Sequence, residues 1–125
     1  MIRDMDLIRD LLLRIEAQTA DEARGMFRPS EIEREVLDGH MMIMIDRGLI
    51  EAKDWQDLQG HNWAMARLAW EGHDFLDSIR DEEIWRKTKE GVRQAGGFSI
   101  DLLKALAKGL LKKKIEHHTG VDLDL

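Results

Sequence analysis

The chain has 125 residues, of which 43% are hydrophobic, enough for one domain with a compact core. It has no cysteine, which excludes disulfides, thiolate catalysis and cysteine-based zinc sites. The net charge of −6 disfavours non-specific attraction to nucleic acid or to an anionic membrane. Residues 1–79 carry 9 Lys and Arg against 17 Asp and Glu, net −8, whereas residues 80–125 carry 10 against 8, net +2.

The first ten residues include Arg3, Asp4, Asp6 and Arg9, so we expect no signal-peptide core. No apolar run approaches the roughly 20 residues of a membrane-spanning helix. We therefore expect a cytoplasmic protein with no membrane span.

The spacing of Met5, Ile8, Leu12 and Ile15 predicts an amphipathic helix over residues 3–17. Residues 18–29 are punctuated by Gly25 and Pro29 and read as irregular. Within them, residues 24–27 are a candidate short strand that would pair with a later hairpin.

Ser30 and Glu33 have the spacing of a capping box, so we expect a helix to begin at Ser30. We expect one helix over residues 30–47, with Gly39 inside it, although Gly39 could instead mark a turn between two short helices. Gly48 is expected to end it as a left-handed cap. His40 is placed near the edge of the core, and a switch role is a distant second interpretation.

A β-hairpin is predicted next, with one strand from Leu49 to Trp55 and the other from His61 to Leu68, around a polar turn. A helix over residues 70–79 follows, with Trp70, Phe75, Leu76 and Ile79 as its buried stripe. Carboxylates near Asp81 favour another helix start, which continues to about residue 94. Ser99 then caps the last helix, which has a broad apolar face and a lysine stripe.

Helix, hairpin and helix in this order are typical of a winged helix-turn-helix. We predict an α+β, mostly helical fold, with a winged-helix-like domain over residues 1–95 and an amphipathic helix over residues 98–118. That helix would pack on the domain or on a second subunit. The predicted core contains these residues: Ile43, Met44, Leu49, Ile50, Trp70 and Phe75.

The chain resembles a bacterial and prophage family of unassigned function, the domain-of-unknown-function 2513 family. The matching segments are residues 3–9, His40, residues 46–51, residues 67–81 with their Trp-Glu-Gly-His run, Ile84-Trp85 and residues 96–100. The resemblance implies a winged-helix outline and supplies no catalytic residues. Ala69 departs from the family, which usually has a threonine before Trp-Glu-Gly.

No enzyme motif is present, and the histidines lack metal-ligand spacing, so we expect no catalysis, no cofactor and no metal. The leading interpretation is a non-enzymatic interaction module that binds a protein partner or self-associates through the last helix. The alternative is a DNA-binding transcriptional regulator. Its candidate nucleic-acid contacts are Arg34, Arg47, Lys53, Arg67, Lys104, Lys108 and Lys112. For the three lysines, a solvated helix face and an anionic membrane surface are the other interpretations.

Overall fold

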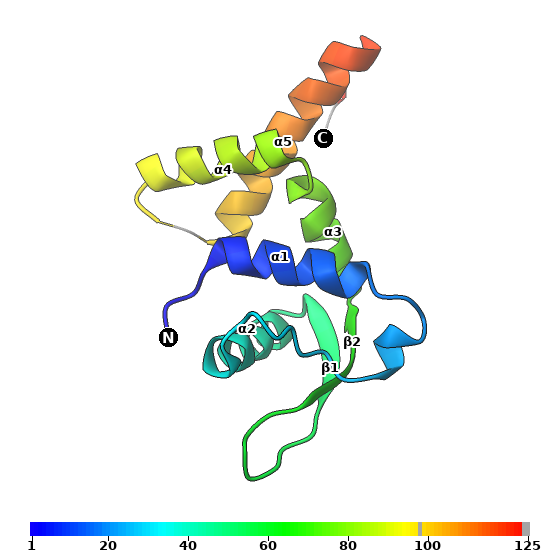
Figure 1. Cartoon of the computed structure of the whole chain (residues 1–125). Helices are drawn as coiled ribbons and strands as arrows, with labels where there is room; N and C mark the ends of the chain where they lie inside the picture. The colour runs from blue at the N-terminus through cyan, green and yellow to red at the C-terminus, as the bar shows by residue number, and fades with distance from the viewer. Residues whose placement is uncertain (98, 124–125) are drawn as a thin grey trace. The chain divides into compact units, whose positions relative to one another are not determined.

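The computed structural model describes residues 1–97 and 99–123. Over these residues the fold is α+β, with five α-helices, one short 3-10 helix and a two-stranded antiparallel sheet (Figure 1). The chain forms two compact units, Met1–Leu76 and Asp77–Leu125. The predicted division into a domain over residues 1–95 and an amphipathic helix over residues 98–118 stays a prediction.

Helix α1 (Met5–Glu16) confirms the predicted first helix and begins two residues later than expected. It starts there because the Asp4 carboxylate accepts hydrogen bonds from the backbone N–H groups of Asp6 and Leu7, at 3.0 and 3.2 Å. The apolar residues of the predicted spacing are buried in one stripe: Met5, Ile8, Leu11, Leu12 and Ile15. This stripe fixes which side of α1 faces the core.

The segment after α1 contains the 3-10 helix η1 (Glu22–Arg24) and then a single β-bridge between Met26 and Ala64. The Phe27 N–H donates to the Trp63 carbonyl at 2.7 Å, and the Met65 N–H donates to the Gly25 carbonyl at 3.1 Å. The predicted pairing of residues 24–27 with the hairpin is therefore confirmed as one bridge rather than a full strand.

Helix α2 (Arg34–Asp46) is the single helix that we predicted, with Gly39 in its interior, but its predicted start at Ser30 is wrong. Residues 30–32 form a turn and a bend, and Glu33 precedes the helix with no side-chain cap bond. The Ser30 hydroxyl instead lies 3.5 Å from the carboxylate of Glu31, which is ion-paired with Arg14 of α1. A contact with another helix has replaced the local capping box.

The end of α2 follows the prediction for Gly48, which has a positive φ of 78°. The Gly48 N–H donates to the Ile45 carbonyl, and the Leu49 N–H donates to the Met44 carbonyl, both at 2.9 Å. These two bonds are those of a Schellman motif. They turn the chain directly from α2 into the hairpin.

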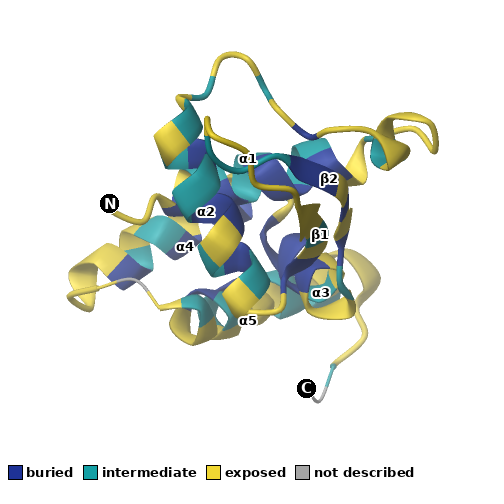
Figure 2. Ribbon diagram, turned by 90° about the horizontal axis from the view of Figure 1, so that it is seen from below, coloured by how far each residue is buried: buried dark blue, intermediate teal, exposed yellow. Residues whose placement is uncertain are grey.

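His40 lies on the buried side of α2 and is 1% exposed, so its predicted position at the core edge is wrong. Figure 2 shows α2 with buried residues on one side and exposed residues on the other. The His40 Nε2 accepts a hydrogen bond from the Asp4 N–H at 2.9 Å, and Nδ1 lies 2.8 Å from the Val36 carbonyl. Because the Asp4 N–H donates to Nε2, Nδ1 is the ring nitrogen that donates to the Val36 carbonyl. His40 thus ties the start of α1 to α2.

Strands β1 (Ile50–Asp54) and β2 (Trp63–Leu68) confirm the predicted hairpin. Glu51 pairs with Arg67 and Lys53 pairs with Ala64, so β2 has one more residue than β1 between the two pairs. This bulge contains Met65, which has a positive φ of 53°. The loop between the strands projects away from α1 and α2 (Figure 1).

Helix α3 (Trp70–Ile79) has the predicted bounds, but the predicted burial of Trp70 is wrong, because Trp70 is 82% exposed. Gly72, rather than Trp70, is the first buried position of α3, ahead of Phe75 and Leu76. A Cβ atom at Gly72 would lie 2.0 Å from the Leu49 carbonyl oxygen. Glycine therefore allows the main chains of α3 and of the segment before β1 to approach closely.

In the second unit, α4 (Glu82–Gln94) packs against α5 (Ile100–Thr119). Asp81 caps α4 through the Ile84 N–H and also accepts a hydrogen bond from the Lys114 ammonium group at 2.6 Å. The Lys114 contact and the Ile84 bond lower the pKa of Asp81, and the Asp81 carboxylate raises the pKa of Lys114. Ser99 caps α5 through the Leu102 N–H, as predicted.

Candidate interaction surface

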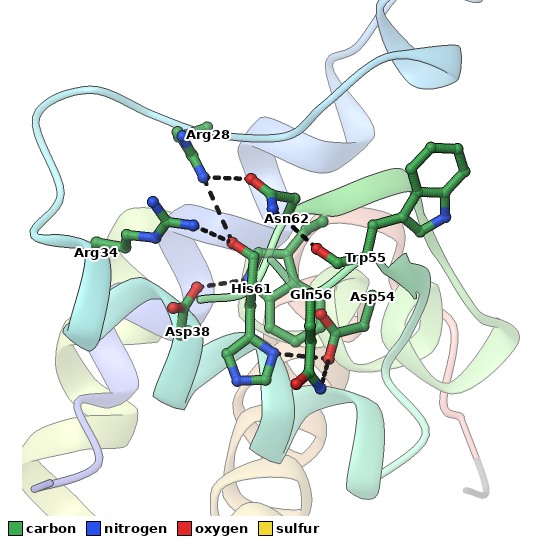
Figure 3. Close-up of polar contacts among 9 residues, drawn as sticks. Arg28, Arg34, Asp38, Asp54, Trp55, Gln56, His61 and Asn62 are labelled. Carbon is green, nitrogen blue, oxygen red and sulfur yellow. Dashed lines mark hydrogen bonds and ion pairs between the residues drawn. The ribbon is translucent and has the colours of Figure 1, made fainter. Parts of the chain in front are cut away.

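The base of the β1–β2 loop is held by two arginines that come from outside the hairpin. Arg34, at the start of α2, donates to the His61 carbonyl at 2.8 Å, and Arg28 approaches the same oxygen at 3.4 Å. Arg28 also donates to the side-chain oxygen of Asn62 at 2.6 Å. Figure 3 shows both guanidinium groups directed at this part of the loop. The loop is therefore fastened to the body of the first unit.

Two stacked aromatic rings lie next to these arginine contacts, at the start of β2. The His61 and Trp63 rings stack at 5.1 Å between centroids and 3° between planes. The Trp63 Nε1 donates to the Asp38 carboxylate of α2 at 2.8 Å, and the His61 Nδ1 lies 2.7 Å from the Asp54 carboxylate. Trp63 itself is 3% exposed. These contacts fix the direction in which the strands leave the body of the unit.

The tip of the loop is closed by its own hydrogen bonds. Asp57 and Gly60 exchange backbone bonds of 2.9 and 3.1 Å, and the Asp57 carboxylate accepts from the Gln59 N–H at 2.8 Å. The Asn62 amide donates to the Trp55 carbonyl at 2.9 Å and to Asp57 at 3.0 Å. The Gln59 N–H, and then the Asn62 amide, lower the pKa of Asp57. These bonds join the two sides of the tip, and the lowered pKa favours the ionised form of the Asp57 carboxylate.

Two large apolar side chains stand on this fixed tip and face solvent. Trp55 is 59% exposed and Leu58 is fully exposed. Figure 3 shows the Trp55 indole pointing away from the polar cluster at the base of the loop. We call Trp55 and Leu58 the apolar tip. The sequence marked this loop as a polar turn and gave no signal that its apolar residues would project.

The predicted nucleic-acid contacts in the first unit are placed in different settings. Arg34 is half-buried and bound to the hairpin, and Arg67 forms an ion pair with Glu51 across the sheet. Arg47 is exposed at the C-cap of α2, and Lys53 is exposed on β1. Arg34 and Arg67 are therefore engaged by groups of the chain itself.

The outer surface of α2, which would be the reading helix of a winged-helix protein, is acidic and apolar. Glu35, Met42 and Asp46 are exposed on it, and Asp38 is half-buried and engaged by Trp63. Phosphate groups are repelled by such a carboxylate-rich face.

The three predicted lysines lie on α5, in the second unit. Lys104 and Lys112 are half-buried and Lys108 is exposed. The Lys112 ammonium group lies 3.9 Å from the Glu116 carboxylate. This spacing is an i,i+4 pair, which stabilises a helix by only about 0.3–0.5 kcal/mol.

Neither a metal site nor a membrane-spanning helix is found among the described residues, 1–97 and 99–123. They hold no group of three His, Cys, Asp or Glu side chains arranged to bind a metal ion. None of their helices has the length and apolar character needed to cross a membrane.

Comparison with known proteins gives two matches that cover most of the chain. Residues 2–99 match the model of a family described as "Hypothetical protein (DUF2513)". The chain is also similar to an uncharacterized protein of Haemophilus influenzae (strain ATCC 51907 / DSM 11121 / KW20 / Rd), with 32% identity over 119 residues. That alignment covers 92% of this chain and 99% of the relative. No solved structure matches the chain significantly.

Proposed function

Since the chain belongs to the family described as "Hypothetical protein (DUF2513)", a description that assigns no activity, we propose its function from its surfaces. The proposal is a non-enzymatic protein-interaction module that docks through the apolar tip. The observation that carries it is the exposure of Trp55 and Leu58 on a loop closed by its own hydrogen bonds. Tryptophan is enriched among residues that dominate binding energy, and a preformed loop loses little entropy on docking.

The scaffold of this module is proposed to be winged-helix-like. The order α1, Met26 bridge, α2, β1, β2 supports this, because the bridge makes β2 the central strand between β1 and the segment before α2. The turn at residues 30–32 takes the place of the middle helix of a three-helix motif. The hairpin then corresponds to the wing.

The charge of the first 79 residues, net −8, favours a partner with a basic surface around an apolar pocket. The alternative, a DNA-binding regulator, would use the exposed side chains of Arg47 and Lys53, since Arg34 is half-buried against the hairpin. The acidic outer face of α2 weighs against it.

Cross-linking tests the apolar tip. A photoreactive benzophenone amino acid at position 55 is expected to give one discrete protein adduct in native cells, and Leu58→Ser should abolish it. Position 70 is the matched control, because Trp70 is exposed on α3 and should not give that adduct. Trp55→Ala should change the free energy of unfolding by less than about 0.5 kcal/mol, as at other exposed sites.

The same preparation distinguishes the DNA alternative. In a gel shift at low salt, we expect no complex at micromolar protein. A complex that weakens with Arg47→Ala and Lys53→Ala, together with no adduct from position 55, would replace the interaction proposal with the regulator.

Self-association through α5 is a second part of the proposal. Ile115 is 37% exposed on this helix, next to the half-buried Leu111. Light scattering should give twice the chain mass of 14.5 kDa, and Ile115→Asp should give the single-chain mass. Val121→Asp, at an exposed position after the helix, should leave the dimer intact. A wild-type monomer would remove this part of the proposal.

A further inference from the structure

The segment that bridges to β2 leaves one of its two edges unpaired. Gly25 and Phe27 direct their main-chain groups to β2, where they bond with Met65 and Trp63. Main-chain groups alternate in direction along an extended segment, so those of Met26 point to the opposite side. Among the residues that the structure describes, neither the N–H nor the carbonyl of Met26 has a partner.

A groove runs along the same segment. It has a volume of about 410 Å³, and its walls include the end of α1, residues 21–22 and residues 25–29. The Met26 side chain is 54% exposed beside it. Both the unpaired main-chain groups and an apolar side chain are therefore accessible from solvent at one place.

The charged side chains that line the groove already make contacts within the chain, and Glu22 accepts a hydrogen bond from the Thr19 N–H at 3.0 Å. Arg14 is paired with Asp10 and Glu31, and Asp21 lies 3.4 Å from Arg24. Arg28 is bound to the hairpin. A charged small molecule would have to displace these pairs, whereas a neutral main chain would not.

We propose that this edge binds an extended peptide segment of a partner protein by β-strand addition. Alternating N–H and carbonyl groups at a sheet edge are satisfied by another extended chain, and adjacent pockets then select its side chains. The accessible edge, Met26 to Arg28, is bounded by Pro29, so the bound segment is short, about five residues. An apolar side chain of the peptide pairs with Met26 across the new ladder.

Met26→Pro isolates the main-chain contribution. It removes the outward N–H but breaks no hydrogen bond that the structure contains. The preceding residue, Gly25, is extended at φ −92° and ψ −164°, a conformation that is compatible with a following proline. Met26→Leu is the matched control, since it keeps both the N–H and an apolar side chain.

The experiment selects binders of the full chain from a random octapeptide library displayed on phage. Enriched peptides should alternate between apolar and polar residues with period two. They should bind Met26→Pro at least tenfold more weakly than the wild type. Met26→Leu and Trp55→Ser should bind them within about twofold, which separates this edge from the apolar tip. If Met26→Pro fails to fold, the enriched peptide is N-methylated at alternate residues instead. This removes the main-chain N–H groups of the peptide that would bond to the edge, and binding to the wild type should weaken.

Two results would overturn the proposal. One is a selection that enriches no peptide. The same holds if the enriched peptides bind Met26→Pro as tightly as they bind the wild type, or if their N-methylated forms bind the wild type as tightly as the unmethylated peptides do. The other is a wild-type dimer by light scattering that Met26→Pro converts to a monomer, since a second copy would then occupy the edge.

Discussion

Replacing Gly72 by alanine is expected to lower the free energy of unfolding by about 3 kcal/mol, the upper part of the range for overpacked sites. The added Cβ would lie 2.0 Å from the Leu49 carbonyl oxygen and 2.9 Å from its carbon. Leu49 cannot simply move away, because the same oxygen accepts a hydrogen bond from the Ala69 N–H at 2.9 Å. Urea unfolding followed by circular dichroism measures the loss.

Gly25→Ala is the matched control in the same unit. Its added Cβ would meet only the Glu22 carbonyl oxygen, at an ordinary distance of 3.6 Å, and its φ of −92° suits any residue. We expect a change of less than about 0.5 kcal/mol. Equal midpoints for Gly72→Ala and Gly25→Ala would show that the approach of α3 to the segment before β1 is not a tight constraint.

Replacing His40 by leucine is expected to cost about 2 kcal/mol of unfolding free energy, since hydrogen-bonding groups near the core lose their partners. The Asp4 N–H loses the ring acceptor and the Val36 carbonyl loses the ring donor. Because Asp4 is also the N-cap of α1, the start of that helix should loosen as well. Thermal unfolding measures the stability, and amide hydrogen exchange at Asp6 and Leu7 measures the loosening.

His73→Leu makes the same chemical change at an exposed position of α3 and should be nearly neutral. An unchanged melting temperature and unchanged exchange for His40→Leu would mean that packing alone joins α1 to α2. The matched pair therefore separates the hydrogen bonds of the ring from its bulk.

Most elements of the fold could be predicted from local patterns. The 3.6-residue spacing located α1, and the cap residues Asp81 and Ser99 begin α4 and α5 where such residues are favoured. The left-handed Gly48 ended α2 as expected. In each case the signal and its physical cause lie within a few residues of each other.

The errors arose where distant contacts override a local pattern. Ser30 and Glu33 have capping-box spacing, but Glu31 between them is engaged by Arg14 of α1, and the helix begins at Arg34. Trp70 was predicted to belong to the buried stripe of α3, but it is 82% exposed. The buried register of α3 instead runs through Gly72, Phe75, Leu76 and Ile79, at the spacing of one helix face.

The candidate surfaces could be predicted least. Trp55 and Leu58 are apolar residues in a polar turn, and only the hydrogen bonds around Asn62 show that they project from a fixed loop. The unpaired edge of Met26 depends on a bridge to Ala64, which lies far along the sequence. The net charge of residues 1–79 led us to expect that phosphate binding there is disfavoured, and this stays a prediction.

The bulge at Met65 has a consequence for how the hairpin tolerates changes in length. Side chains alternate between the two faces of a strand, so the extra residue in β2 decides which face every later pair presents. Removing one residue from each strand would exchange the two faces on the tip side, whereas removing two residues from each strand would shorten the arm and keep its faces. Among relatives, length changes in the two strands should therefore be matched, and a change in one strand alone should accompany a different binding surface.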